Sequence, residues 1–285
     1  MPPEPRIARV RVGDVEIEVE EHGDGPRAFV LVHGFTGSRD DFREMLPRLA
    51  ERGRTLALDL RGHGGSTNTG DLASYTLDAL YGDVLGALDA LGVERCDLLG
   101  HSMGGMVAMR VALDAPERVA SLVLMNTAPS PVTPGARRFF EAAAKIAREQ
   151  GMEALAAISR AAAERDQRPR AFRRCVERMG AELFWPRQRA KMLAMDPAAF
   201  EALGYALTDH PGVEHRLGEL RCPTLVLVGA EDEPFLEAAA RMEAAIPGAR
   251  RVVVEDAAHS PQFENPEAWL AAVLDHLARA RAEGA

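Results

Sequence analysis

The sequence predicts an α/β fold in which a mostly parallel sheet is covered by helices on both faces. Uninterrupted apolar runs, such as residues 29–32 and 119–125, are typical of strands that are buried on both faces. Stretches of helical character separate these runs, and strands that alternate with helices build a parallel sheet. The alternation stops at Asn126, and the chain to about His210 has only helical character. We therefore expect a helical insertion over the carboxyl edge of the sheet, where such sheets bind ligands.

Each element has its own local signal. Residues 7–21 alternate apolar and charged side chains around Gly13-Asp14, which predicts a hairpin with one solvated face. The later strands are instead apolar on both faces. The elements expected after the hairpin are, in chain order, strand 29–32, a helix ending near residue 50, strand 55–60, helix 76–91, a strand ending at residue 99, helix 106–113, strand 119–125, the helical block, strand 223–229, helix 235–246, strand 251–254 and a helix from residue 266.

Prolines divide the helical block. Pro169, Pro186 and Pro197 each lie where a helix can begin, because proline is tolerated in the first turn of a helix. The expected organisation is a core made of residues 1–128 and 211–285, with residues 129–210 as a helical cap.

The composition is typical of a globular protein of the cytoplasm. The 285 residues are 47% hydrophobic, and the net charge of −9 opposes binding to nucleic acid or to an anionic membrane surface. Cys96, Cys175 and Cys222 lie far apart and predict neither a disulfide framework nor a metal site. We expect no secretory signal, no membrane-spanning segment and no cofactor, since no phosphate loop or dinucleotide fingerprint occurs.

Gly100-His101-Ser102-Met103-Gly104 is the motif with the clearest chemical meaning. It lies between an apolar run that ends at Leu99 and a helical stretch that begins near Met106. A serine in such a strand-to-helix turn has a strained backbone and an exposed hydroxyl, and the glycines avoid collisions with neighbouring elements. With 8 serines and 25 glycines in the chain, chance placement would give about 0.06 such motifs. Ser102 is therefore the predicted nucleophile.

A serine hydroxyl needs a general base, and His259 is the best placed of the eight histidines. It follows directly after the last predicted strand, in a loop at the carboxyl edge of the sheet. His22 and His276 are expected at the surface. The other histidines either precede or adjoin Ser102 or follow no strand: His33, His63, His101, His210 and His215.

Asp232 is the expected carboxylate partner of this base. It follows the strand that ends at Gly229, and the chain order serine, aspartate, histidine is the one expected for this architecture. Glu231 and Glu233 are alternatives, although such residues are usually solvated loop charges. The strand before the insertion ends in Asn126-Thr127, which carries no carboxylate and offers no rival.

Two backbone N–H groups are expected to stabilise the negative oxygen that forms during acyl transfer. Met103, the residue after the predicted nucleophile, offers its N–H at the start of a helix. The turn His33-Gly34-Phe35 offers a second donor, most simply the N–H of Phe35, because the glycine lets the backbone approach a ligand.

Apolar clusters at helical spacing in the cap are expected to wall a pocket. The predicted substrate-binding side chains are His33 and His101 on the core side, with Phe139, Trp185 and Met192 on the cap side.

Together these residues resemble the α/β-hydrolase fold superfamily with a helical cap. His33-Gly34-Phe35, the turn 59–66, the Ser102 motif, Asp232 and His259 fall in the family's order over nearly the whole chain. The resemblance implies an eight-stranded sheet and a cap over the site. Ser102 stands where haloalkane dehalogenases and epoxide hydrolases carry aspartate, so those two reactions are not expected.

The expected function is cofactor-free hydrolysis of small carboxylic esters by a Ser-Asp-His triad, with a small-molecule ester as the partner. Residues 33–38 and 229–235, together with a cap opening near Thr133-Pro134-Gly135, resemble the menaquinone-pathway synthase of this superfamily, an elimination enzyme. Met106, however, stands where that family carries an arginine. A hydrolase that cleaves carbon–carbon bonds of dienones, or a lactonase, would carry the same triad. A ligand receptor that retains the triad is the least expected alternative.

Overall fold

The centre of the molecule is one sheet, with eight strands among the residues that the computed structural model describes (4–131, 136–165 and 168–283). The strands follow the order β1-β2-β4-β3-β5-β6-β7-β8. β2 pairs antiparallel with β1 and β4, and all other neighbours are parallel, so the predicted fold class is confirmed. The strands are β1 (Arg6–Val12), β2 (Val15–His22), β3 (Ala28–Val32), β4 (Thr55–Leu58), β5 (Cys96–His101), β6 (Val119–Met125), β7 (Thr224–Gly229) and β8 (Arg250–Val254).

Each face of the sheet has its own apolar core, because successive side chains of a strand point to opposite faces. In β6, Leu122 and Leu124 pack in the cluster that includes α2 (Leu77–Ala90), α3 (Met103–Asp114) and α8 (Glu233–Ala245), whereas Val123 and Met125 pack in the cluster with α1 (Leu46–Ala50) and α10 (Pro266–Glu283). Every residue of β3 to β7 is buried as a result. The helices that flank the sheet are α1 (Leu46–Ala50), α2 (Leu77–Ala90), α3 (Met103–Asp114), α8 (Glu233–Ala245) and α10 (Pro266–Glu283), and the short α9 (Pro261–Glu264) precedes α10.

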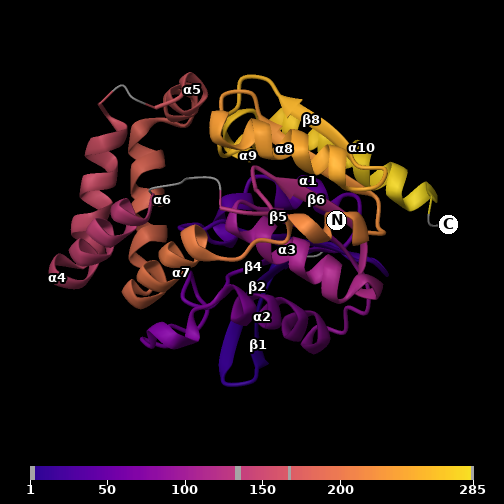
Figure 1. Cartoon of the computed structure of the whole chain (residues 1–285), viewed down its shortest axis with the longest axis horizontal. Helices are drawn as coiled ribbons and strands as arrows, with labels where there is room; N and C mark the ends of the chain where they lie inside the picture. Colours follow the sequence, from indigo (N-terminus) through magenta and orange to yellow (C-terminus); the bar gives the residue numbers. More distant parts are fainter. Residues whose placement is uncertain (1–3, 132–135, 166–167, 284–285) are drawn as a thin grey trace.

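A helical insertion lies between β6 and β7, to one side of the sheet (Figure 1). Its described helices are α4 (Ala136–Ala163), α5 (Arg170–Met179), α6 (Ala181–Leu193) and α7 (Pro197–Asp209). α4 is broken at Gly151, where φ is +84° and ψ is 166°, and it packs against α6 and α7. The insertion contacts the core where α7 meets the turn at residues 72–74 and where α5 meets α9. The predicted opening at Thr133-Pro134-Gly135 lies outside the described residues.

Two local expectations are wrong. Pro186 lies inside α6 instead of at its start. The helix begins earlier because Gly180 ends α5 at φ +81° and its carbonyl accepts the N–H groups of Leu183 and Phe184. His276 is only 3% exposed, since it lies three residues after Val273 on the face of α10 that packs against the sheet.

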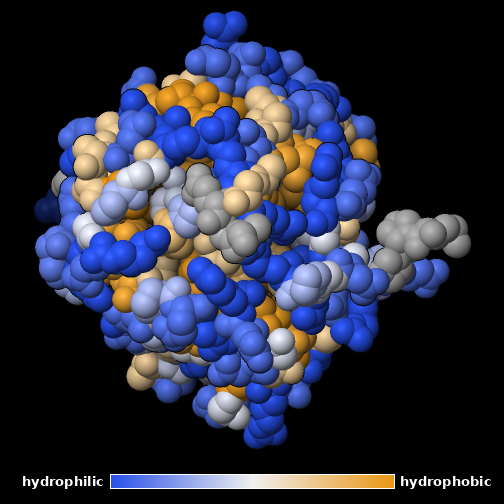
Figure 2. Space-filling view, turned by 90° about the vertical axis from the view of Figure 1, so that its right-hand side faces the viewer, coloured by the Kyte–Doolittle hydropathy of each residue, from blue (hydrophilic) through white to orange (hydrophobic). Residues whose placement is uncertain are grey.

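The face turned away from α4 to α6 is mainly hydrophilic, with separate small apolar areas (Figure 2). None of the described helices is both long enough and apolar enough to cross a membrane.

Candidate active site

Ser102 lies at a sharp turn between β5 and α3. Its backbone has φ +53° and ψ −117°, a combination that costs energy for a residue with a side chain. A Cβ atom on Gly104 would lie 2.4 Å from the Val32 carbonyl oxygen, and one on Gly100 would lie 2.2 Å from the Gly104 carbonyl oxygen. Only glycine therefore lets α3 begin this close to the sheet. The Ser102 N–H donates to the Met125 carbonyl at 2.9 Å, which fixes the turn against β6.

The three predicted polar side chains meet in one hydrogen-bonded chain. Ser102 Oγ lies 3.1 Å from His259 Nε2, and His259 Nδ1 lies 2.8 Å from Asp232 Oδ2. Each residue follows the carboxyl end of a different strand, β5, β8 and β7 respectively. A neutral imidazole in this position donates from Nδ1 to the carboxylate and accepts the serine proton at Nε2. Asp232 is 7% exposed, whereas 42% of the His259 side chain is open to solvent.

The two predicted N–H donors lie on either side of Ser102. Met103 is the first residue of α3, and the first N–H groups of a helix have no acceptor within the helix. Gly34 adjoins the serine, since a Cβ atom there would lie 3.1 Å from Ser102 Cβ. Within the described part of the chain, the N–H of Phe35 donates no hydrogen bond. Among the described residues, both N–H groups are therefore open to an oxygen of a ligand.

His33 and His101 lie beneath the site as buried structural groups. The Leu60 N–H donates to His33 Nε2 at 3.0 Å, so Nδ1 carries the proton and donates to the Gly34 carbonyl at 2.7 Å. Burial lowers the pKa of His33 to about 3 and that of His101 to about 4, which keeps both rings neutral. His101 Nε2 donates to the His259 carbonyl at 2.6 Å. His33 thus shapes the turn that precedes Phe35, and His101 holds the backbone of the predicted base.

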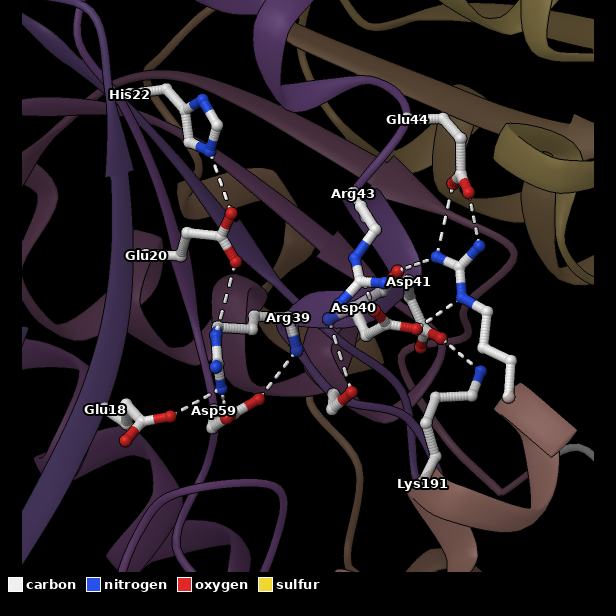
Figure 3. A network of polar contacts seen from close by, with 12 residues as sticks. Glu18, Glu20, His22, Arg39, Asp40, Asp41, Arg43, Glu44, Asp59 and Lys191 are labelled. Atoms are coloured by element: carbon white, nitrogen blue, oxygen red, sulfur yellow. Dashed lines mark hydrogen bonds and ion pairs between the residues drawn. The ribbon is translucent and has the colours of Figure 1, made fainter. Parts of the chain in front are cut away.

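The segment after Phe35 is anchored on two sides (Figure 3). Arg39 bonds Glu18 and Asp59 on the core side, with its Nη1 2.7 Å from Glu18 Oε1. Arg187 and Lys191 of α6 bind the same segment from the helical insertion. Their carboxylate partners are Asp40 and Glu44 for Arg187, and Asp41 for Lys191.

The aromatic residues of the insertion divide into two groups. Phe140 and Phe200 lie against the Phe35 ring, with centroids 5.5 Å and 5.1 Å from it. Phe139 is 68% exposed and contacts Phe140 edgewise, so it turns away from this cluster.

The other two predicted pocket residues pack in different apolar clusters. Trp185 packs with Phe172 and Phe184 in a separate apolar cluster. Met192 is half-buried against the main core. Phe140, one residue from the predicted Phe139, shows that helical spacing alone did not identify the inward face.

A hollow of about 290 Å³ lies beside α3, where both connections of the insertion meet the core. Met106, Ala128, Pro129 and His210 contribute to its wall. It does not include Ser102, Asp232 or His259.

Two residues that the sequence analysis missed hold the predicted acid and base. Asn126 Nδ2 donates to Asp232 Oδ2 at 2.6 Å and to the Ala258 carbonyl at 2.9 Å. Glu264 Oε2 accepts the N–H groups of Ala258 and Ser260, at 2.6 Å and 3.0 Å. The sequence feature that could have identified Asn126 is its position directly after a buried strand.

The described residues contain no group of three or more His, Cys, Asp and Glu side chains arranged to hold a metal ion.

Comparison with known proteins gives one family. A family model described as "alpha/beta hydrolase fold" matches residues 27–266. The chain is 33% identical over 279 residues to the dihydrolipoyllysine-residue acetyltransferase component of the acetoin cleaving system of Cupriavidus necator, which covers 93% of this chain and 67% of that protein. It is 31% identical over 288 residues to the 2-hydroxy-6-oxononadienedioate/2-hydroxy-6-oxononatrienedioate hydrolase of Cupriavidus pinatubonensis, which covers 95% of this chain and 94% of that one.

A solved structure is similar over the whole fold. The thermophilic esterase of Thermogutta terrifontis superposes with a TM-score of 0.81 at 28% identity, over 96% of this chain and 99% of that one.

Proposed function

The chain belongs to the alpha/beta hydrolase fold family, and from this premise we propose that it is a serine hydrolase that cleaves small carboxylic esters. The observation that carries the proposal is the hydrogen-bonded chain from Ser102 Oγ through the His259 imidazole to the Asp232 carboxylate. A nucleophile, a base that reaches it and a carboxylate that orients the base are the parts that acyl transfer requires. The similarity to an esterase over 96% of the chain agrees with this chemistry.

In the proposed mechanism, Ser102 Oγ attacks the ester carbonyl carbon while His259 Nε2 takes the serine proton. The N–H groups of Phe35 and Met103 stabilise the oxyanion of the tetrahedral intermediate. The intermediate collapses to an acyl-serine ester, and the imidazolium returns its proton to the departing alkoxide, which leaves as the alcohol. His259 Nε2 then deprotonates a water molecule as it attacks the acyl carbon. The second tetrahedral intermediate collapses, the imidazolium returns the proton to the departing Ser102 Oγ, and the carboxylic acid is released.

The helical insertion is proposed as the cap of this site, over residues 129–210. Phe140 and Phe200 pack on the Phe35 ring, whose backbone N–H is one of the two proposed oxyanion donors. The insertion therefore contributes apolar surface next to the position of the reacting carbonyl, and its aromatic rings are suited to the apolar part of a small ester.

Hydrolysis of a carbon–carbon bond in a dienoate is the second candidate. The observation that favours it is the similarity to the dienoate hydrolase of Cupriavidus pinatubonensis over 95% of the chain. Such a reaction would use the same serine and histidine, so substrate turnover has to separate the two.

The test is a panel of p-nitrophenyl acetate and butyrate, a simple lactone and a dienone ring-cleavage product, assayed with the wild type and Ser102→Ala. We expect ester hydrolysis by the wild type and a loss of several orders of magnitude in kcat for the variant. Ser121→Ala, a buried serine of β6 bonded to Asp97, is the matched control and should keep its activity. Ester hydrolysis that survives in Ser102→Ala would refute the mechanism, and turnover of the dienone alone would favour the second candidate.

A further inference from the structure

Asn126 is the first residue after β6. Its side chain lies between the Asp232 carboxylate and the backbone of the loop that carries His259. Its Nδ2 group donates to Asp232 Oδ2 at 2.6 Å and to the Ala258 carbonyl, next to His259, at 2.9 Å. The carboxylate oxygen that accepts from Asn126 is the same one that accepts from His259 Nδ1. One amide therefore contacts both the acid and the loop that carries the base.

We propose that Asn126 is a positioning residue for Ser102 activation, whose amide fixes the Asp232 carboxylate and the His259 loop in one arrangement. The inference rests on the proposed function, since it assigns Asn126 a part in making Ser102 reactive. Asn126 touches no reacting atom and acts through Asp232 and His259.

The backbone at Asn126 supports a specific role for this side chain. Its φ is +45°, in the left-handed region that asparagine tolerates better than most residues with a side chain. Its N–H donates to the Leu227 carbonyl of β7 at 2.8 Å, so the strained residue is held between the ends of two strands.

The amide of Asn126 is also costly to bury. The residue is 1% exposed, and its Oδ1 has no hydrogen-bond partner among the described residues. An unpaired buried carbonyl oxygen destabilises a protein, so packing alone does not account for an amide here. The two hydrogen bonds that Nδ2 donates, to Asp232 and to Ala258, offset the cost of burying the unpaired Oδ1.

The hydrogen bond from Asn126 has an electrostatic consequence for His259. A donor on Asp232 Oδ2 withdraws negative charge from the oxygen that faces the imidazolium, so it weakens the stabilisation of the protonated base. Loss of the amide should therefore raise the pH at which His259 becomes competent to accept the serine proton.

Among the described residues, charged or titratable groups face His259 or its loop from four neighbouring elements, and one of these groups is Arg174 of α5, which pairs with Asp256 of the loop at 2.8 Å. Asp232 bonds the ring, His101 of β5 lies 5.1 Å away between ring centroids, and Glu264 of α9 bonds the backbone on both sides. Burial lowers the pKa of His101 to about 4, so it is neutral where activity is measured. Burial raises the pKa of Glu264. These groups are unchanged in an Asn126 variant. A difference between the pH profile of the variant and that of the wild type is therefore due to the loss of the Asn126 amide.

The experiment measures the rate at which a fluorophosphonate reporter labels Ser102, from pH 5 to pH 9, in the wild type, Asn126→Ala and Asn126→Asp. In Asn126→Ala we expect a rate about tenfold lower at its plateau, from the loss of a charge-assisted hydrogen bond. We also expect the acid limb of the profile to shift upward by about half a pH unit to one unit. Ser121→Ala, in the same strand but away from the site, controls for loss of stability and should leave the profile unchanged.

Asn126→Asp keeps the shape of the side chain and guards against a variant that fails to fold. Two carboxylates 2.6 Å apart cannot both ionise freely, so the pair retains a proton at low pH and carries two charges at high pH. The second charge favours protonated His259, and the acid limb should move up further than in Asn126→Ala. An acid limb that stays at the wild-type position in both variants would overturn the inference, whether or not the rate falls.

The reporter also separates this inference from the proposed function, because it reacts with an activated serine whatever the natural substrate. If the wild type is labelled at Ser102 but hydrolyses no ester, the proposed substrate class is contradicted. The pH profiles of labelling in the Asn126 variants would still test the role of Asn126.

Discussion

Lys191 of α6 forms an ion pair with Asp41, and both side chains are more than nine-tenths buried (Figure 3). Asp41 lies against the turn that carries Phe35, since a Cβ atom on Gly37 would lie 2.2 Å from its Oδ2. Burial by itself would raise the pKa of Asp41, but the Lys191 ammonium outweighs it and holds the pKa below the usual range. The pair thus joins the helical insertion to the segment next to the proposed oxyanion site.

Lys191→Met should destabilise the protein by about 3–5 kcal/mol, because it leaves the Asp41 carboxylate buried without a cation. The double variant Lys191→Met/Asp41→Asn should recover part of this loss, since no unpaired charge remains. Urea unfolding at pH 7 measures both. The control is Lys145→Met, an exposed lysine of α4, which should change the free energy of unfolding by less than about 0.5 kcal/mol. Equal stability of Lys191→Met and the control would contradict the prediction.

Gly104→Ala and Gly82→Ala should have opposite effects on stability. The added methyl group at Gly104 would lie 2.4 Å from the Val32 carbonyl oxygen and 2.5 Å from that of His33, and backbone at the start of α3 cannot move aside cheaply. We expect a loss of about 3 kcal/mol or more. Gly82, exposed within α2, has no atom within 4 Å of an added Cβ, so alanine should stabilise by about 0.5–1 kcal/mol. Thermal unfolding of the two variants checks the signs, and a stable Gly104→Ala would contradict the close packing.

Deprotonation of the Glu264 carboxyl should lower the free energy of unfolding as the pH rises above 4.5. Burial raises the pKa of its carboxyl above the ordinary value of 4.5, although two backbone N–H groups favour the charged form. The folded protein then binds this proton more tightly than the unfolded chain, so the stabilisation is complete below pH 4.5 and is lost as the pH rises through the folded pKa.

Glu264→Gln removes this titration. The free energy of unfolding of the variant should therefore fall less than that of the wild type between pH 4.5 and pH 8, as measured by urea unfolding at several pH values. Glu267→Gln, an exposed residue in the first turn of α10, should follow the wild type. Parallel curves for the wild type and Glu264→Gln would show that burial does not control this carboxyl.

The proposed triad could be predicted because its signals are local. Ser102, Asp232 and His259 each lie within five residues of the end of a strand, and the carboxyl ends of parallel strands meet at one edge of the sheet. The strained turn at Ser102 needs glycines at fixed offsets, which the sequence displays. For the same reason the order of strands and helices could be predicted from the position of the apolar runs.

The supporting residues depend on contacts that no short stretch contains. Asn126 reaches Asp232 because Met125 pairs with Leu227, a register set by the packing of the whole sheet. Lys191 and Asp41 are 150 residues apart and meet only once the insertion has folded onto the core.

The sequence also could not predict which face of α4 points inward. Adjacent Phe139 and Phe140 have the same hydrophobicity, and the packing of α4 on α7, where a Cβ atom on Gly204 would lie 2.8 Å from the Phe140 ring, decides which ring turns inward.

Asp232→Asn should lower kcat for ester hydrolysis by about 10⁴-fold while the protein stays folded. The amide cannot supply the negative charge that stabilises the imidazolium, and its NH₂ group can turn His259 to the wrong tautomer. Kinetics with p-nitrophenyl butyrate and a thermal unfolding curve test this.

Glu231→Gln is the matched control for that variant, because the two acids are neighbours in the loop after β7. Glu231 accepts the N–H of Ala171 at 2.8 Å and pairs with Arg174, so its carboxylate is bonded to α5, whereas the carboxylate bonded to His259 is that of Asp232. We expect its kcat to stay within about twofold of the wild type, the range of a surface change outside the reacting groups. A large loss of kcat in Glu231→Gln together with near-normal turnover in Asp232→Asn would reassign the carboxylate to Glu231.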